Sequence, residues 1–235
     1  MSQWKKYRKW KNVSVQKSMI GFKIFLDKEE LLTPKSNAFL MTSEKLATQV
    51  AKEWESQEKF LRPSTMRLTT FVNSAIDKVK EDYSLIVEDL LSYGETDLLC
   101  YKAESPKDLV ELQNLHWDPI LKWSAKDLGI RLRCFSGIKY QSQALKEIEK
   151  IRKILEKFDH FTLTAFSELV TISGSMLLAL ALYFNEVDVE RAWHKSVLDE
   201  VWQASKWGYD EESTRVRKNK LDDFKFAFEF LSLLK

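Results

Sequence analysis

The segment that most constrains the fold is LVTISGSMLLALALYF, residues 169–184, which contains no charged side chain. Glu168 and Glu186 flank it, and a membrane-spanning helix needs about 20 apolar residues. We therefore interpret the segment as a helix buried inside the protein and expect no membrane insertion. A helix that is apolar on all sides has to be covered by other elements, so the rest of the chain must build a core around it.

The composition is that of a globular protein with few chain-breaking residues. Of 235 residues, 44% are hydrophobic and 31% are charged, with only 6 glycines and 4 prolines. Such a low glycine content favours long helices over a loop-rich all-β fold. The formal net charge of +2 gives no global field that would attract nucleic acid or an anionic membrane. Two cysteines, Cys100 and Cys134, cannot build a disulfide framework, and we expect reduced thiols in a cytosol-like compartment.

Strands are expected at the start of the chain and a helix after them. NVSVQKS and GFKIFLD both alternate in hydropathy and are joined as the two strands of a hairpin would be. A helix is predicted from Ser43 as its N-cap, with an apolar stripe at Leu46, Val50 and Trp54. Pro63 should break this pattern.

Short strands and helices are predicted to alternate in the middle of the chain, and only helices after it. The predicted elements, in order, are one or two helices ending at Gly94, a buried strand over 97–103, a helix capped by Ser105 with Pro106 first and Gly129 at its end, a strand over 130–140, and helices near 142–157, 161–184, 187–207 and 211–234. Asp118 and Pro119 indicate either a kink in one helix or the start of a second.

These elements predict an α+β fold with two domains. A small N-terminal domain, residues 1–140, should contain the short antiparallel strands, and an all-α helical domain should follow over residues 141–235.

Motifs for catalysis or for cofactors are missing from the sequence. It contains neither a GxxxxGK[ST] nor a GxGxxG phosphate-binding loop, and no GxSxG elbow. The three histidines do not have the spacing of metal ligands. We therefore expect no cofactor, no metal and no enzymatic activity.

Two alternative functions stay open at this point. Asp97 and Cys100 offer an acid and a thiol for a small cytosolic hydrolase or transferase, although a lone cysteine on an apolar strand is more often a small buried hydrophobe. Aromatic and basic residues interleave from Trp4 to Lys11, as in an RNA-binding module. A solvated terminus is the commoner meaning of such a run, and we expect no nucleic-acid partner.

The segment EVDVERAWHKSVLDEVWQASKWGYDEE is the strongest indication of protein binding. On a continuous helix Trp193, Glu200 and Trp207 are seven residues apart and share one stripe, while Trp202 points roughly the opposite way. Exposed aromatic residues beside acids are typical of a protein–protein contact. A large core that covers both faces is the other interpretation. Asp199 and Glu200 are adjacent, so they diverge on a helix and make a poor acid–base pair.

Several segments, in a fixed order, match a known family. They are LLTP (31–34), LATQVAKEWESQ (46–57), RLTTFVNSAIDKV (67–79), TDLLCYKAESPKDLVELQ (96–113), WDPILKW (117–123), TISGSMLLALAL (171–182) and AWHKSVLDEVWQASKWGYDEE (192–212). Over roughly residues 7 to 232 the sequence resembles the F1-ATPase assembly chaperone family that protects the F1 alpha subunit in mitochondria and related bacteria.

The resemblance implies a molecular chaperone rather than an enzyme. Such a protein binds the unassembled alpha subunit of F1 ATP synthase and prevents its aggregation before assembly with beta. The family's functional acid falls in LDEVWQ, which places it at Glu200 with Asp199 as the fallback, and Trp54 matches a family tryptophan. Together with Trp193 and Trp207, these are the predicted partner-binding residues. We expect a monomer that is cytoplasmic in bacteria, with relatives in the mitochondrial matrix.

Overall fold

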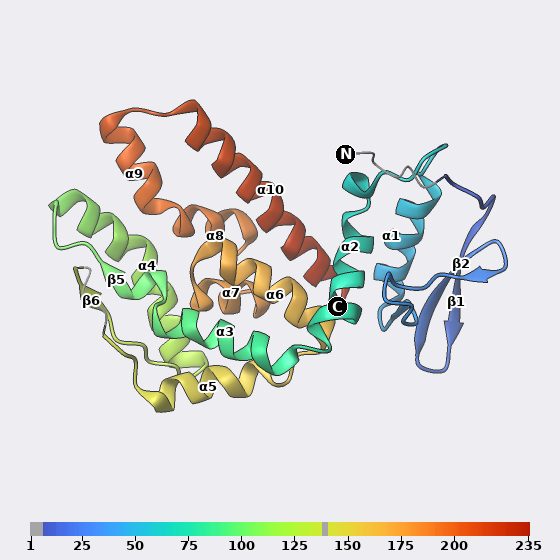
Figure 1. Ribbon diagram of the computed structural model, residues 1–235. Coiled ribbons are helices and arrows are strands. Elements are labelled where there is room, and N and C mark those ends of the chain that lie inside the picture. Colours follow the sequence, from blue (N-terminus) through green and yellow to red (C-terminus); the bar gives the residue numbers. More distant parts are fainter. Residues whose placement is uncertain (1–6, 138–140) are drawn as a thin grey trace. The chain divides into compact units, whose positions relative to one another are not determined.

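The computed structural model describes residues 7–137 and 141–235 and divides the chain into two compact units (Figure 1). Unit 1 takes the described part of Met1–Tyr83 together with Asp159–Ala165 and Glu229–Lys235, and unit 2 takes Ser84–Phe158 and Phe166–Phe228. The short strands lie mainly near the N-terminus and helices follow, which confirms the α+β class. None of the borders between these two units falls at residue 140. The division into domains 1–140 and 141–235, which concerns parts that would fold independently, therefore stays a prediction.

A small antiparallel sheet forms one layer of unit 1. Strands β1 (Val13–Ser18) and β2 (Gly21–Leu26) form the predicted hairpin, in the register that pairs Val13 with Leu26. The two-residue strands β3 (Glu29–Glu30) and β4 (Leu40–Met41) also pair with β2, so β2 is the central strand.

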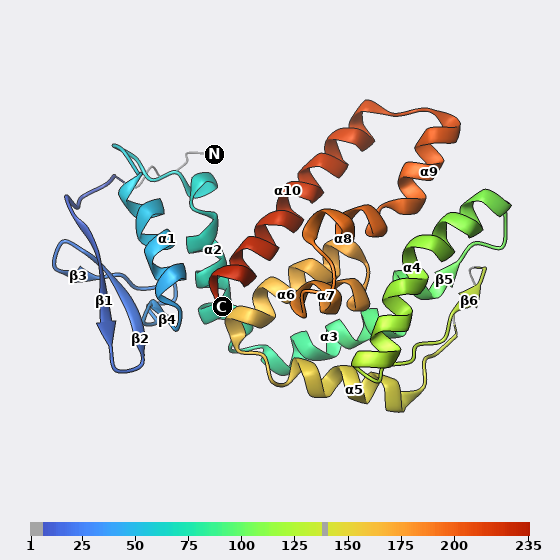
Figure 2. The same ribbon diagram turned by 180° about the vertical axis from the view of Figure 1, so that it is seen from behind.

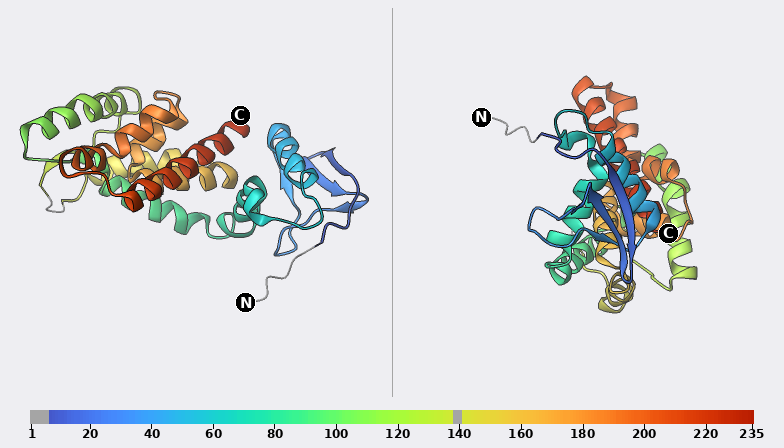
Figure 3. Two further views of the ribbon diagram at one scale, coloured as in Figure 1. Left: turned by 90° about the horizontal axis from the view of Figure 1, so that it is seen from above. Right: turned by 90° about the vertical axis from the view of Figure 1, so that its right-hand side faces the viewer.

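Helix α1 (Glu44–Glu55) covers this sheet, as Figure 3 shows. Ser43 is its N-cap, as predicted, because the side-chain oxygen of Ser43 accepts a hydrogen bond from the backbone N–H of Leu46. The apolar face of α1 buries Leu46, Ala47 and Val50. After α1 the chain forms a 3₁₀ turn, η1 (Pro63–Thr65), then α2 (Arg67–Ser74) and a π-helical turn, η2 (Ala75–Val79).

Unit 2 is built around a helix that has no exposed side. The bounds of the helices that contribute to it are α3 (Tyr83–Glu95), α4 (Lys107–Asp127), α5 (Leu145–Leu155), α6 (His160–Ser173), α7 (Met176–Tyr183), α8 (Val189–Ser196), α9 (Leu198–Trp207) and α10 (Glu211–Leu233). Every residue from Met176 to Leu182 in α7 is completely buried, which confirms the interpretation of the uncharged segment as a core helix. Among the described residues, no helix has the length and apolarity that crossing a membrane requires.

Two helices that the sequence predicts as continuous are each divided in two. The helix expected over 161–184 ends at Ser173 because Gly174 has a left-handed backbone (φ 67°), and Ser175 then caps α7. The helix expected over 187–207 breaks at Val197, which separates α8 from α9. Neither break coincides with a proline or a charge, so the hydropathy pattern continues through both.

Two predicted helix ends are wrong, and one is confirmed. Gly94 lies inside α3 rather than at its end. A β-carbon at position 94 would come within 3.0 Å of Ile151 Cδ1, so glycine lets α5 approach α3 closely. Ser105 does not cap α4, because Pro106 is the N-cap and no side chain caps that end. The C-terminus of α4 is as expected, with Gly129 (φ 68°) following the C-cap. Pro119 lies within this single helix, which settles the choice left open there.

The strand predicted over 97–103 is mostly wrong. Leu98–Cys100 form a 3₁₀ turn, η3, and only β5 (Tyr101–Lys102) is extended. The strand predicted over 130–140 is likewise reduced to β6 (Phe135–Ser136), while positions 138–140 lie outside the described residues. β5 and β6 pair in parallel (Figure 2).

The reason for the turn at Leu98 is the buried carboxylate of Asp97. It accepts hydrogen bonds from the backbone N–H of Leu99 at 2.9 Å, from Ser175 Oγ at 2.9 Å and from the N–H of Leu177 at 2.9 Å. Burial raises the pKa of the Asp97 carboxyl to about 6, although the N–H groups of Leu177 and Leu99 act in the opposite direction. Asp97 therefore closes η3 and anchors the N-terminus of α7.

We expect Asp97→Ala to destabilise unit 2 strongly. The substitution leaves the Ser175 hydroxyl and two backbone N–H groups buried without their acceptor, which should lower the free energy of unfolding by about 3 kcal/mol. Urea denaturation followed by circular dichroism measures the loss. A change below about 0.5 kcal/mol would show that water replaces the carboxylate and that the anchor is dispensable.

Candidate functional site

The candidate site lies on the hairpin that α9 and α10 form in unit 2 (Figures 1 and 2). Gly208 adopts a left-handed backbone (φ 102°) directly after α9, which turns the chain towards α10. Between the two helices is a hollow of about 310 Å³, which we call the hairpin hollow. Its lining residues are Glu200, Gln203, Ala204, Trp207, Gly208, Tyr209, Asp210, Ser213, Thr214 and Arg217.

Glu200 presents its carboxylate to solvent in this hollow. Its side chain is 54% exposed, and Oε2 lies 3.5 Å from Nε of Arg217, whose side chain is only 18% exposed. Arg217 comes from α10, so the ion pair joins the two helices of the hairpin. The result is an ion pair between an exposed acid and a mostly covered cation, whose buried Nε makes no hydrogen bond among the described residues.

Asp199, the neighbouring acid, belongs to a different environment. It is half-buried, and its Oδ1 accepts a hydrogen bond from Gln113 Nε2 at 2.8 Å. Gln113 Oε1 in turn accepts the backbone N–H of Ala103 at 2.8 Å. Burial raises the pKa of Asp199, against the hydrogen bond from Gln113, which lowers it. Asp199 therefore ties α9 to α4 and to the segment after β5.

The tryptophans that the sequence places on one stripe are separated by the break at Val197. Trp193 is 4% exposed, and its ring centroid lies 5.7 Å from that of Phe224 in the core. Trp207, by contrast, is 77% exposed. Its ring meets the ring of Trp202 edge-on, with centroids 6.0 Å apart. The predicted stripe is therefore wrong for Trp193, whereas Glu200 and Trp207 both line the hairpin hollow and Trp202 lines a different set of α9 neighbours.

A short polar network holds Trp202 beneath Trp207. Trp202 Nε1 donates to Asp108 Oδ2 at 3.3 Å, and Lys206 Nζ lies 2.8 Å from the same oxygen. Lys206 also lies over the Trp202 ring, 5.4 Å from its centroid. Because Trp202 is fixed in this way, it provides a support against which the exposed Trp207 ring rests.

Trp54, the fifth predicted residue, belongs to unit 1, whereas the other four belong to unit 2. Its half-buried ring packs on Trp10, with centroids 5.2 Å apart. Its Nε1 has no hydrogen-bond partner among the described residues. The ring also lines a hollow of about 540 Å³ together with Phe39, Pro63 and Met66.

An apolar groove beside the hairpin hollow is a feature that sequence reasoning missed. Its volume is about 370 Å³, and its lining residues are Leu112, His116, His194, Leu198, Val201, Trp202 and Ser205. Burial lowers the pKa of His116, and the nearby positive charges of Lys195 and His194 lower it further. Apolar residues on α4 and α9 alone do not distinguish a groove from core packing, so no signal in the sequence identifies it.

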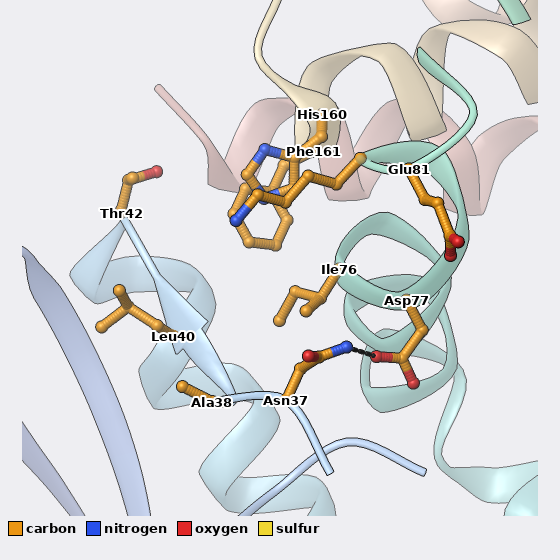
Figure 4. Close-up of a pocket in the computed structure, with 10 residues that line it drawn as sticks. Asn37, Ala38, Leu40, Thr42, Ile76, Asp77, Glu81, His160 and Phe161 are labelled. Carbon is orange, nitrogen blue, oxygen red and sulfur yellow. Dashed lines mark hydrogen bonds between the residues drawn. The ribbon is translucent and has the colours of Figure 1, made fainter. Parts of the chain in front are cut away.

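A second hollow in unit 1, of about 540 Å³, contains polar groups that are already paired (Figure 4). Asn37 Nδ2 donates to Asp77 Oδ1 at 2.8 Å, and the Thr33 hydroxyl and the Lys35 N–H donate to the same carboxylate. Desolvation raises the pKa of Asp77, but these hydrogen bonds outweigh it and leave the pKa lowered. The ring of His160 packs on Phe161 at 4.3 Å. The carboxylate of Asp77 is thus already occupied by contacts within unit 1.

The thiol of the acid–thiol site that the sequence left open, Cys100, is not accessible. Cys100 is completely buried, and its interaction with Cys134, together with burial, raises the pKa of its thiol. Asp97 is occupied as the anchor of α7. Within the described ranges, no cluster of three or more histidine, cysteine or acidic side chains could hold a metal ion.

The basic segment from Trp4 to Lys11 lies partly outside the described residues. Of its described part, Arg8 uses its guanidinium within unit 1 by donating to the carbonyl oxygens of Trp10, Lys11, Glu55 and Gln57. Arg8 is thus committed to the fold, and this reduces the support for an RNA-binding module.

Comparisons with known proteins assign this α+β fold to a class of chaperones. The profile of the family described as ATP12 chaperone protein matches residues 7–125. The chain is 26% identical over 230 residues to the mitochondrial protein atp12 of Schizosaccharomyces pombe, covering 91% of this chain and 79% of that protein.

Solved structures extend the likeness to almost the whole chain. Atp12 from Paracoccus denitrificans is 34% identical with a TM-score of 0.94, covering 97% of this chain and 98% of that one. A mutant of the same protein with lysine in place of an aspartate gives the same values. A protein from Agrobacterium tumefaciens is 36% identical with a TM-score of 0.90. The chain therefore belongs to the ATP12 chaperone family, which confirms the resemblance to F1-ATPase assembly chaperones.

The two tryptophans should differ sharply when each is replaced by alanine. Trp193→Ala removes a core ring and should cost about 3–5 kcal/mol of unfolding free energy. Trp207→Ala removes an exposed ring and should change it by no more than about 0.5 kcal/mol. Guanidinium denaturation measures both, and equal losses in the two variants would contradict this assignment.

Proposed function

We propose that this protein binds the unassembled alpha subunit of F1 ATP synthase and prevents its aggregation before assembly with beta. The observation that carries the proposal is the match to the ATP12 family and to Atp12 structures over almost the whole chain. The physical need is general, because a ring subunit exposes a large apolar interface before the ring closes. A chaperone covers that interface and later gives way to the true partner.

The hairpin hollow is the proposed contact surface. Trp207 and Tyr209 are 77% and 64% exposed and lie beside Glu200. Exposed aromatic side chains are the commonest anchors of protein interfaces, and a neighbouring charge adds specificity. The apolar groove that includes Val201 and Trp202 uses the other face of α9, so it is not part of this proposed contact surface.

The other predicted residues take different parts in this proposal. Asp199 holds α9 in place through Gln113, and Trp193 packs on Phe224 of α10 in the core. Trp54 lines its own hollow in unit 1 and is proposed as a second contact. The buried Cys100 thiol supports a role without enzymatic activity.

We also propose that the protein acts as a monomer. The proposed compartment is the bacterial cytoplasm, or the mitochondrial matrix in organellar relatives, because its relatives include bacterial and mitochondrial proteins.

We expect Glu200→Lys to abolish protection of the alpha subunit while the chaperone stays folded. Reversing an exposed charge should change the free energy of unfolding by no more than about 1 kcal/mol. Loss of a central charged contact should weaken binding at least about tenfold. Co-expression with the alpha subunit, followed by pull-down and light scattering of the released alpha, measures both effects.

Glu149→Lys on α5 is the matched control. Its side chain is 56% exposed and lies 3.2 Å from Nε of Arg152, so it copies the exposure and the ion pair of Glu200. This variant should capture the alpha subunit as wild type does. If wild-type protein captures another partner but no alpha subunit, the proposed function is wrong. If the Glu200→Lys protein unfolds, Glu200 has a structural role. If both variants lose alpha-subunit binding equally, the contact lies elsewhere.

A further inference from the structure

The two cysteines, far apart in the sequence, come next to each other at β5 and β6. The parallel register pairs Tyr101 with Phe135 and Lys102 with Ser136, so Cys100 and Cys134 are one step earlier on the two segments. The rings of Tyr101 and Phe135 meet with centroids 5.8 Å apart, which brings the ends of the two preceding segments together. Cys100 is the last residue of η3 and Cys134 directly precedes β6, and their two thiols are hydrogen-bonded to each other.

The spacing suits a disulfide. The hydrogen bond between the two thiols places the sulfurs in direct contact, and the strand pair that follows, about 4.8 Å apart, begins within the range of about 4.4–6.8 Å between α-carbons that disulfides require. Both thiols are free in this structure, Cys100 buried and Cys134 exposed. A small oxidant can thus reach Cys134, while Cys100 is reached only through it.

The electrostatic surroundings favour Cys134 as the thiolate. A hydrogen bond from the Cys100 thiol lowers the pKa of Cys134, against burial, and Lys102 lowers it further. The carboxylates of Asp118 and Asp97 act in the opposite direction. The same thiol–thiol interaction raises the pKa of Cys100. Only the exposed sulfur is therefore activated.

We propose that Cys100 and Cys134 are a redox-sensitive dithiol that hydrogen peroxide closes to an intramolecular disulfide. The Cys134 thiolate attacks one peroxide oxygen, the O–O bond breaks, and the departing hydroxide is protonated to water. Cys134 is then a sulfenic acid. Next the Cys100 sulfur attacks the Cys134 sulfur, the S–O bond breaks, and the hydroxide leaves as a second water with the Cys100 proton. Both sulfurs are oxidised and the peroxide is reduced to two waters.

This dithiol is independent of what the hairpin hollow binds. Disulfides in reducing compartments are mostly transient and regulatory, and thiol reductants reopen them by exchange. The disulfide would covalently join the segment before β5 to the segment before β6. The two cysteines together are therefore a modification site of the folded chain.

The test uses the full-length reduced protein with an equimolar amount of hydrogen peroxide. We expect both thiols to be lost together, in a chain whose mass is lower by two hydrogen atoms. Peptide mapping without reductant should recover Cys100 joined to Cys134, and dithiothreitol should restore both thiols. In Cys134→Ser, which changes an exposed side chain, Cys100 should stay reduced under the same treatment.

A second variant separates the two steps. In Cys100→Ser the sulfenic acid on Cys134 should persist and react with dimedone, and no internal disulfide should form. Circular dichroism checks that this buried substitution leaves the chain folded. If the Cys100→Ser protein is unfolded, the peptide mapping of the wild-type protein and the Cys134→Ser result decide the question without it. The proposal is overturned if peroxide carries Cys134 to the sulfinic acid, or joins two chains through it, while Cys100 of the wild-type protein keeps its thiol.

Discussion

The interaction on which unit 2 most depends is the anchoring of α7 by the buried carboxylate of Asp97. α7 has no exposed side, and the first N–H groups of any helix lack partners within it. Solvent does not reach this end, so the acceptors must come from the protein. The Ser175 hydroxyl accepts the N–H of Leu178 at 3.1 Å, and Asp97 accepts both the N–H of Leu177 and the Ser175 hydroxyl. A carboxylate at a helix N-terminus is also favoured by the helix dipole.

The segment that follows this anchor is joined by two polar contacts to α9, the helix that carries the candidate site. Asp97 closes the turn η3, which leads directly into β5. The backbone just after β5, at Ala103, donates to Gln113 on α4, and Gln113 donates to Asp199 on α9. Each group in this series is at least partly buried, so leaving one unpaired carries a desolvation cost. The position of α9 is thus fixed from the core outwards.

The sequence was sufficient for the features that depend on local pattern and insufficient for those that depend on distant partners. The hairpin of β1 and β2, the cap at Ser43 and the end of α4 at Gly129 all follow from neighbouring residues, and all are confirmed. The role of Asp97 requires Ser175, which lies far along the chain, so the local pattern suggested a strand and a possible catalytic acid instead. The break at Val197 has no signal, and it separates the environments of Trp193 and Trp207.

The structure also distinguishes the two adjacent acids, which the family resemblance leaves as alternatives. Successive helical residues diverge by about 100°, so when Asp199 faces Gln113, Glu200 must face the hairpin hollow. A carboxylate has two oxygens that together accept about four hydrogen bonds, and at Glu200 the recorded contact is between Oε2 and Arg217. The ion pair with Arg217 therefore leaves most of the hydrogen-bonding capacity of the Glu200 carboxylate unused. The exposure of the ion pair keeps its own contribution to stability small, so in the proposed function Glu200 is the acid that stays available to a partner.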